Sequence, residues 1–116
     1  MINALNEIEK ICKKYVANTN VISETEGEGI KCLINHGSGV KKREIRSAKI
    51  WDFHMRITVR DNNENWRTVL KALLGIARDL TDNKEHKWIV GDIENNDSAS
   101  DYSLSISLTV PYHPGD

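Results

Sequence analysis

The sequence has few of the residues that hold small folds together by covalent or metal bonds. It contains only two cysteines, Cys12 and Cys32, in 116 residues. Their spacing forms neither a zinc-ligand pattern nor a CxxC redox motif. We therefore expect both to be small core residues that stay reduced. A chain of this length can bury roughly two-thirds of its unfolded surface, so we expect one domain over residues 1–116.

Long apolar runs and an excess of one charge are also missing. No run approaches the ~18 apolar residues that a membrane span needs, and the start MINALNEIEK lacks the pattern of a secretion signal. We therefore expect a cytoplasmic protein with no membrane partner. Sixteen basic residues face seventeen acidic ones, for a net charge of -1. A nucleic-acid binder usually carries a basic excess, so nucleic acid is an unlikely partner.

Groups of catalytic or metal-binding residues are missing as well. The four histidines form no HxxxH or HExxH pair, and no pair of carboxylates with a shared role can be identified. The HGSG segment at residues 36–39 lacks the frame of a phosphate loop and instead predicts a tight hairpin turn. We therefore predict no catalytic, cofactor or metal site, and a protein that is not an enzyme. The histidines are His36, His54, His86 and His113.

Two stretches have the three-and-four spacing of an amphipathic helix. The first, residues 2–16, sets apolar side chains such as Ile8 and Cys12 against a charged face. The second, residues 66–80, follows the capping segment DNNE and is interrupted by Gly75. Glycine inside a helix costs about 1 kcal/mol relative to alanine. A close approach to the sheet would explain why it is there.

Strand patterns occupy most of the remaining chain. Residues 50–60 alternate apolar and polar side chains, which predicts one buried and one polar sheet face. At ~3.3 Å per residue this strand is long for a small domain, so one end is expected to project past the core. Shorter strands are predicted at residues 30–34, 87–94 and 102–110, with Pro111 ending the last. Residues 40–49 indicate either a strand with little to bury or a mobile hairpin arm, and residues 20–29 a loop or a poorly paired strand.

The order α-β-β-β-α-β-β predicts an α+β fold. We expect a mainly antiparallel sheet with two helices packed on one face. The other sheet face would carry polar side chains and could meet water or a partner.

The sharpest local feature is a basic segment after the predicted turn. Its functional interpretation is a contact with phosphates or an acidic protein surface. Its structural interpretation is a charge-protected edge strand. A second, weaker candidate is the polar face of the long strand. The candidate interaction residues are Lys41, Lys42, Arg43, Arg46 and Lys49 in the basic segment, and His54 and Arg56 on the strand.

The element order resembles that of a known protein class. A basic segment (HGSGVKKREIRSAK), a long aromatic strand (IWDFHMRITVR), a helix (DNNENWRTVLKALLGIARDL) and a closing strand (YSLSISLTVPY) follow one another. This is similar to the tail terminator and minor capsid proteins of long-tailed phages and prophages, over nearly the whole chain. Many of those relatives have a glycine-rich turn where this chain has Arg46, Ser47, Ala48 and Lys49.

The resemblance implies a structural virion protein. Such a protein forms a ring, usually a hexamer, that caps the tail tube and joins it to the head-neck complex. The implied partners are the chain itself, the tail tube protein and neck or head-completion proteins, in the host cytoplasm and then the virion tail. The alternative is a small regulatory or immunity-type module that binds an acidic protein, or nucleic acid, through residues 41–49.

Overall fold

The computed structural model describes residues 2–22, 28–45, 48–83, 87–96, 98 and 100–112, except for the side chains of 2, 36–39, 41, 45 and 48. His86 and His113 lie outside this part of the chain. The elements are α1 (Ile2–Tyr15), β1 (Thr19–Val21), β2 (Lys31–Ile45), β3 (Ala48–Asn62), a 3-10 turn (Asn63–Asn65), α2 (Trp66–Thr81), β4 (Ile89–Asn95) and β5 (Asp101–Tyr112).

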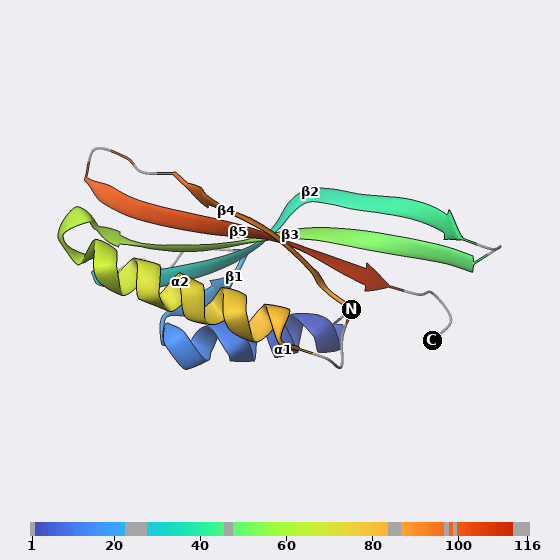
Figure 1. Ribbon diagram of the computed structural model, residues 1–116, viewed down its shortest axis with the longest axis horizontal. Coiled ribbons are helices and arrows are strands. Elements are labelled where there is room, and N and C mark those ends of the chain that lie inside the picture. Colours follow the sequence, from blue (N-terminus) through green and yellow to red (C-terminus); the bar gives the residue numbers. More distant parts are fainter. Residues whose placement is uncertain are drawn as a thin grey trace.

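The strands form a single five-stranded sheet in the order β1-β2-β3-β5-β4. β1 pairs with β2 in parallel, and the other neighbours are antiparallel. Both helices lie on the same face of the sheet and run in opposite directions (Figure 1). The predicted α+β class, the mainly antiparallel sheet, the placement of the helices and the order α-β-β-β-α-β-β are confirmed.

The core lies between the helix pair and the helix-side face of the sheet. Met55, Ile57 and Val59 of β3 are buried there, as their alternation predicts. The apolar stripes of both helices pack against this face, which gives each helix its tertiary stabilisation. The fully buried side chains of the core include Ile8, Cys12, Val16, Ile34, Ile57, Val59, Val69, Leu73, Ile76, Leu80, Ile106 and Leu108.

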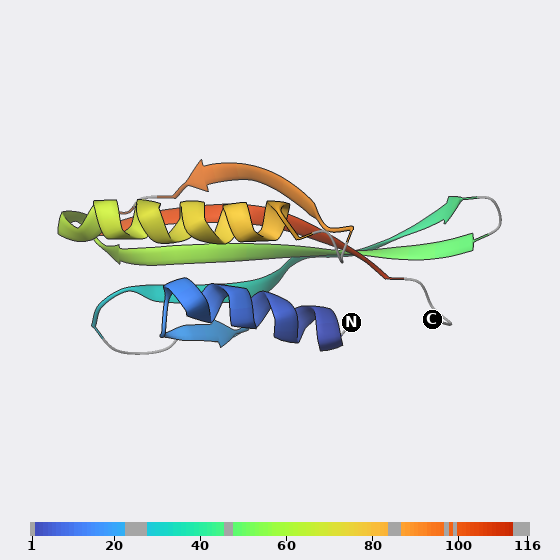
Figure 2. The same cartoon turned by 60° about the horizontal axis from the view of Figure 1, so that its bottom comes forward.

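The molecule is elongated because β2 and β3 continue past the helices. Its extents are 51 × 24 × 23 Å, and the 15-residue β3 accounts for the long axis at ~3.3 Å per residue. Beyond the helix ends, the β2–β3 hairpin projects with the last residues of β5 beside it (Figure 2). We call residues 39–45, 48–53 and 110–112 the arm. The predicted projection of the long strand is thus found in the structure.

Two predicted strand boundaries are wrong. Residues 36–39 do not turn; they lie inside β2, where the pairing register with β3 shifts between Asn35 and Gly39. The predicted strand at 30–34 and most of the segment 40–49 belong to one strand, β2, and the first strand before α2 is the short β1, which begins just before the 20–29 segment expected to be a loop or a poorly paired strand. Pro111 does not end β5, which pairs it with Asp52 and continues to Tyr112. β4 pairs with β5 only as far as Thr109, so a residue without an N–H is tolerated on that open edge.

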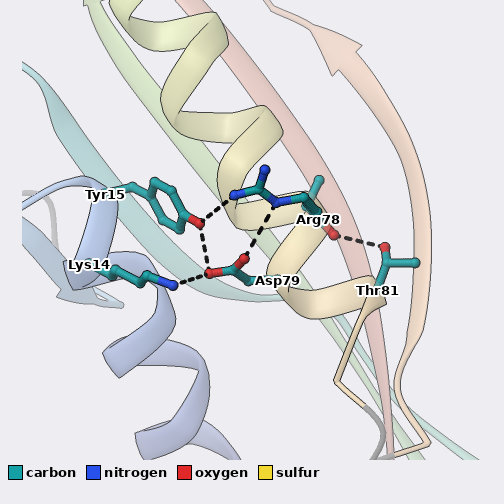
Figure 3. Close-up of polar contacts among 6 residues, drawn as sticks. Lys14, Tyr15, Arg78, Asp79 and Thr81 are labelled. Carbon is teal, nitrogen blue, oxygen red and sulfur yellow. Dashed lines mark hydrogen bonds and ion pairs between the residues drawn. The ribbon is translucent and has the colours of Figure 1, made fainter.

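Gly75 marks a close approach, but its neighbour is a helix rather than the sheet. A Cβ built at this position would lie 2.3 Å from a ring carbon of Tyr15. Glycine therefore lets the last residue of α1 place its ring directly against α2 (Figure 3). The expected contact with the sheet is wrong, because the α2 residues that face the sheet are the larger apolar ones.

Candidate interaction surfaces

The helix-side face of the arm carries a group of partly exposed apolar side chains. Cross-strand partners share a sheet face. The register pairs Val40 with Phe53, and Trp51 with Tyr112. All four therefore lie on the sheet face that the helices cover elsewhere in the molecule. Phe53 and Tyr112 make an edge-to-face contact with centroids 6.1 Å apart. Val40 is 50% exposed. We call Val40, Trp51, Phe53 and Tyr112 the aromatic face.

The opposite side of the arm is held by an ion pair between neighbouring strands. Arg43 of β2 donates to both carboxylate oxygens of Asp52 on β3, with Nη2 to Oδ1 at 2.9 Å. Asp52 is buried, so this two-pronged contact supplies partners that water cannot. The hydrogen bond to Asp52 raises the pKa of Arg43. Arg43 therefore stabilises the arm instead of standing free as a binding cation.

The predicted basic segment is split by the strand register. Lys42 and Lys49 are exposed on the helix-side face. The ammonium of Lys42 lies 5.8 Å from the centroid of the Trp51 ring. Arg43 lies on the other face, and Lys41 and Arg46 fall on positions whose side chains are outside the described residues. The described side chains therefore do not form a single basic patch.

His54 and Arg56 lie on the face of the sheet that the helices leave open. The Nδ1 atom of His54 is 3.2 Å from the Oγ1 atom of Thr109, and Arg56 pairs with Glu94 at 3.2 Å. Both line a hollow of about 470 Å³ that Asn35 and Ser107 share. The structure therefore separates these two residues from the arm's aromatic face.

The outer edge of β2 is open along most of its length. β1 pairs only with residues 32–34 of β2, and within the described chain β1 and β3 are the only strands beside it. The edge from Asn35 onward thus presents backbone groups that could pair with an added strand.

A second polar cluster lies where the two helices meet. The Tyr15 hydroxyl donates to the Oδ2 atom of Asp79 at 2.7 Å, and the Lys14 ammonium donates to the same oxygen at 3.0 Å (Figure 3). Arg78 donates to the Tyr15 oxygen at 3.4 Å. The hydrogen bonds from Tyr15 and Lys14 hold the pKa of Asp79 below its usual value. One carboxylate thus orders the side chains of both helices here.

This cluster borders a groove of about 590 Å³ between the helices. Lys14 and Tyr15 line it from α1, and Lys71, Leu74 and Arg78 line it from α2. These residues are not among the interaction residues predicted from the sequence. The three- and four-residue spacing of the α2 group already places them on one helical face, but the contribution of α1 depends on tertiary packing.

Both cysteines lie in the core, as expected from their apolar surroundings. Cys12 is 0% and Cys32 is 2% exposed, and neither is in a disulfide. The hydrogen bond with the Cys32 sulfur, together with burial, raises the pKa of Cys12 far above its usual value. Cys12 is therefore a neutral thiol at physiological pH, which is the unreactive form.

The described residues show neither a metal-binding cluster nor a membrane-spanning helix. Within residues 2–22, 28–45, 48–83 and the described parts that follow, no three His, Cys, Asp or Glu side chains are grouped to hold a metal. In the same part of the chain, every helix is too short or too polar to cross a membrane.

Comparison with known proteins gives weak structural similarity. No protein-family model and no curated protein matches the chain. Among solved structures, the core region of PilO from the type IV pilus system of Pseudomonas aeruginosa is similar, with a TM-score of 0.32 and 16% sequence identity over 69% of this chain and 84% of that chain. At this TM-score the likeness says nothing about what this chain binds.

The predicted tail-terminator identity is wrong. The structural match leads to a protein of a pilus system rather than to a phage tail protein, and no family model or curated protein supports the resemblance. It rested on element order, which unrelated α+β proteins can share. The hexameric ring and the contacts with tail tube and neck proteins, which were implied by that resemblance, fall with it.

Proposed function

We propose that this chain is a non-catalytic module that binds a protein partner through the arm. The observation that carries the proposal is the aromatic face of the arm, with Val40 half exposed. The strands of the arm project past both helices (Figure 2). Aromatic side chains are enriched at protein interfaces because they offer large contact areas with few rotatable bonds. Together with the open edge of β2, they offer a partner both backbone and side-chain contacts.

The chemistry of the arm favours a different protein over a second copy of this chain. Antiparallel pairing of two β2 edges centred on Lys42 would bring the Lys41-Lys42-Arg43 runs of two copies alongside each other. Like charges facing each other across strands are destabilising. A partner strand that lays apolar side chains over the aromatic face avoids this repulsion, and strand addition supplies the main-chain hydrogen bonds.

The contacts of the arm's cations also favour a protein partner over a nucleic acid. Two of the arm's cations are already engaged: Arg43 is bound to Asp52, and Lys42 lies over Trp51 and 3.9 Å from Glu44. Phosphate binding relies on free cations that release counterions. The described part of the arm therefore supplies aromatic surface more than free charge.

Site-specific photo-crosslinking in the cells that make the protein tests the proposal. A photoreactive residue at position 40 is expected to form a discrete protein adduct, and the double substitution Trp51→Ala/Phe53→Ala should abolish it. A photoreactive residue at position 58, on the helix-free face, is the matched control and should give no adduct. Adducts of equal yield at both positions, adducts with nucleic acid, or adducts only with the chain itself would overturn the proposal.

A further inference from the structure

We propose that the groove between α1 and α2 is a second docking surface, which takes an acidic, amphipathic segment of a protein partner. The groove is separate from the arm: its lining residues belong to the two helices, whereas the aromatic face consists of β2, β3 and β5 residues. At about 590 Å³ it is large enough for several side chains of a bound segment.

Charge on the rim of the groove is unbalanced. Lys14, Lys71 and Arg78 line it. Asp79 pairs with Lys14 and Arg78, and the charge of Asp82 also acts on Arg78. The side chains of Lys14 and Arg78 remain 66% and 69% exposed, so each keeps donors that face solvent. Lys71 is exposed and makes no ion pair with a described residue. The rim therefore attracts carboxylates, and Asp79 fixes where two of the cations stand.

Apolar atoms in the same groove select against simple anions. Leu74 is 49% exposed on one wall, and the ring of Tyr15 forms the other wall against Gly75. An aliphatic side chain seated between Leu74 and Tyr15 would remove apolar surface from water on both sides. Carboxylates one helical turn away from that side chain would then reach the cations. This combination describes an amphipathic acidic segment, the type of ligand that helix grooves take.

Binding of designed probe peptides tests the inference. The probe is a fluorescent helical peptide of about four turns, with leucines on one face and glutamates on the other. Fluorescence anisotropy gives the Kd, and amide shifts in 15N-labelled protein locate the site. We expect shifts centred on Leu74 and Gly75, and a roughly tenfold weaker Kd for Lys71→Glu. Leu74→Ser should also weaken binding roughly tenfold.

Matched variants and peptides make the outcome decisive. Lys10→Glu makes the same charge change on an exposed part of α1 outside the groove, and Ile89→Ser removes an exposed aliphatic side chain from β4. Both should bind the probe like the unmodified protein. The inference is overturned if Lys71→Glu and Lys10→Glu bind equally, or if the unmodified protein binds no probe. It is also overturned if peptides with lysine for glutamate, or serine for leucine, bind as well as the probe.

Discussion

The ring of Tyr15 fills the space that a side chain at Gly75 would need. The ring carbons lie 2.3–2.9 Å from the Cβ position, and the Tyr15 hydroxyl is tied to Asp79. The ring therefore cannot swing aside without losing a hydrogen bond. This contact explains why glycine stands in the middle of α2, although it makes the helix about 1 kcal/mol less stable than alanine would.

Gly75→Ala should lower the free energy of unfolding in spite of the better helix propensity of alanine. Overpacking typically costs about 1–3 kcal/mol, which exceeds the propensity gain of about 1 kcal/mol. We expect a net loss of up to roughly 2 kcal/mol in urea denaturation. In a Tyr15→Ala background the clash is gone, so the same substitution should stabilise the protein. Stabilisation in both backgrounds would show that the ring does not constrain position 75.

The lowered pKa of Asp79 predicts a pH-dependent contribution to stability. Because the folded-state pKa lies below the unfolded one, the contribution is present above the unfolded pKa and is lost as pH falls through the folded pKa. Asp79→Asn should therefore cost about 1 kcal/mol at neutral pH, and this difference should shrink at about pH 3. Denaturation curves at both pH values measure it. Glu64→Gln, which removes an exposed charge elsewhere, should show no such pattern; a cost for Asp79→Asn that is equal at both pH values would contradict the assignment.

The ion pair between Arg43 and Asp52 predicts that Arg43 contributes more to the free energy of unfolding than the neighbouring Lys42. Arg43→Ala leaves the buried Asp52 carboxylate without its partner, which should cost about 1–3 kcal/mol. Lys42→Ala removes an exposed cation and should change stability by less than about 0.5 kcal/mol. Replacing both Arg43 and Asp52 with leucine should recover most of the loss. Equal effects of Arg43→Ala and Lys42→Ala would refute the structural role of Arg43.

The sequence predicted those parts of the fold that depend on local periodicity. The alternation in β3 identified Met55, Ile57 and Val59 as core residues, and the three-and-four spacing identified both helices. The HGSG segment was misread because glycines are typical of turns. Here the long β3 pairs with β2 on both sides of this segment, so the strand passes through the glycines with a shift of register.

Candidate sites were harder to predict because they depend on which segments meet. The basic run was visible in the sequence, but the capture of Arg43 by Asp52 follows from the pairing of β2 with β3. Beside the groove, Lys14 donates a hydrogen bond to Asp79, which is 65 positions away in the sequence. No local pattern predicts such a contact. The alternation predicts Trp51 and Phe53 on the buried face, because it shows which face a residue shares but not where the helices end.

The buried cysteines predict that thiol labelling reports on opening of the fold. Cys12 and Cys32 are almost completely buried, and the raised pKa of Cys12 keeps its sulfur protonated. A thiol reagent should therefore react only when the structure opens. Labelling should be slow in the native protein, and Gly75→Ala should accelerate it about tenfold for each 1.4 kcal/mol of lost stability. Cys32→Ala isolates the rate of Cys12, whose α1 packs on Gly75 through Tyr15. Rapid labelling of the folded protein, or a rate that Gly75→Ala leaves unchanged despite its lower stability, would show that the thiols are reached without unfolding.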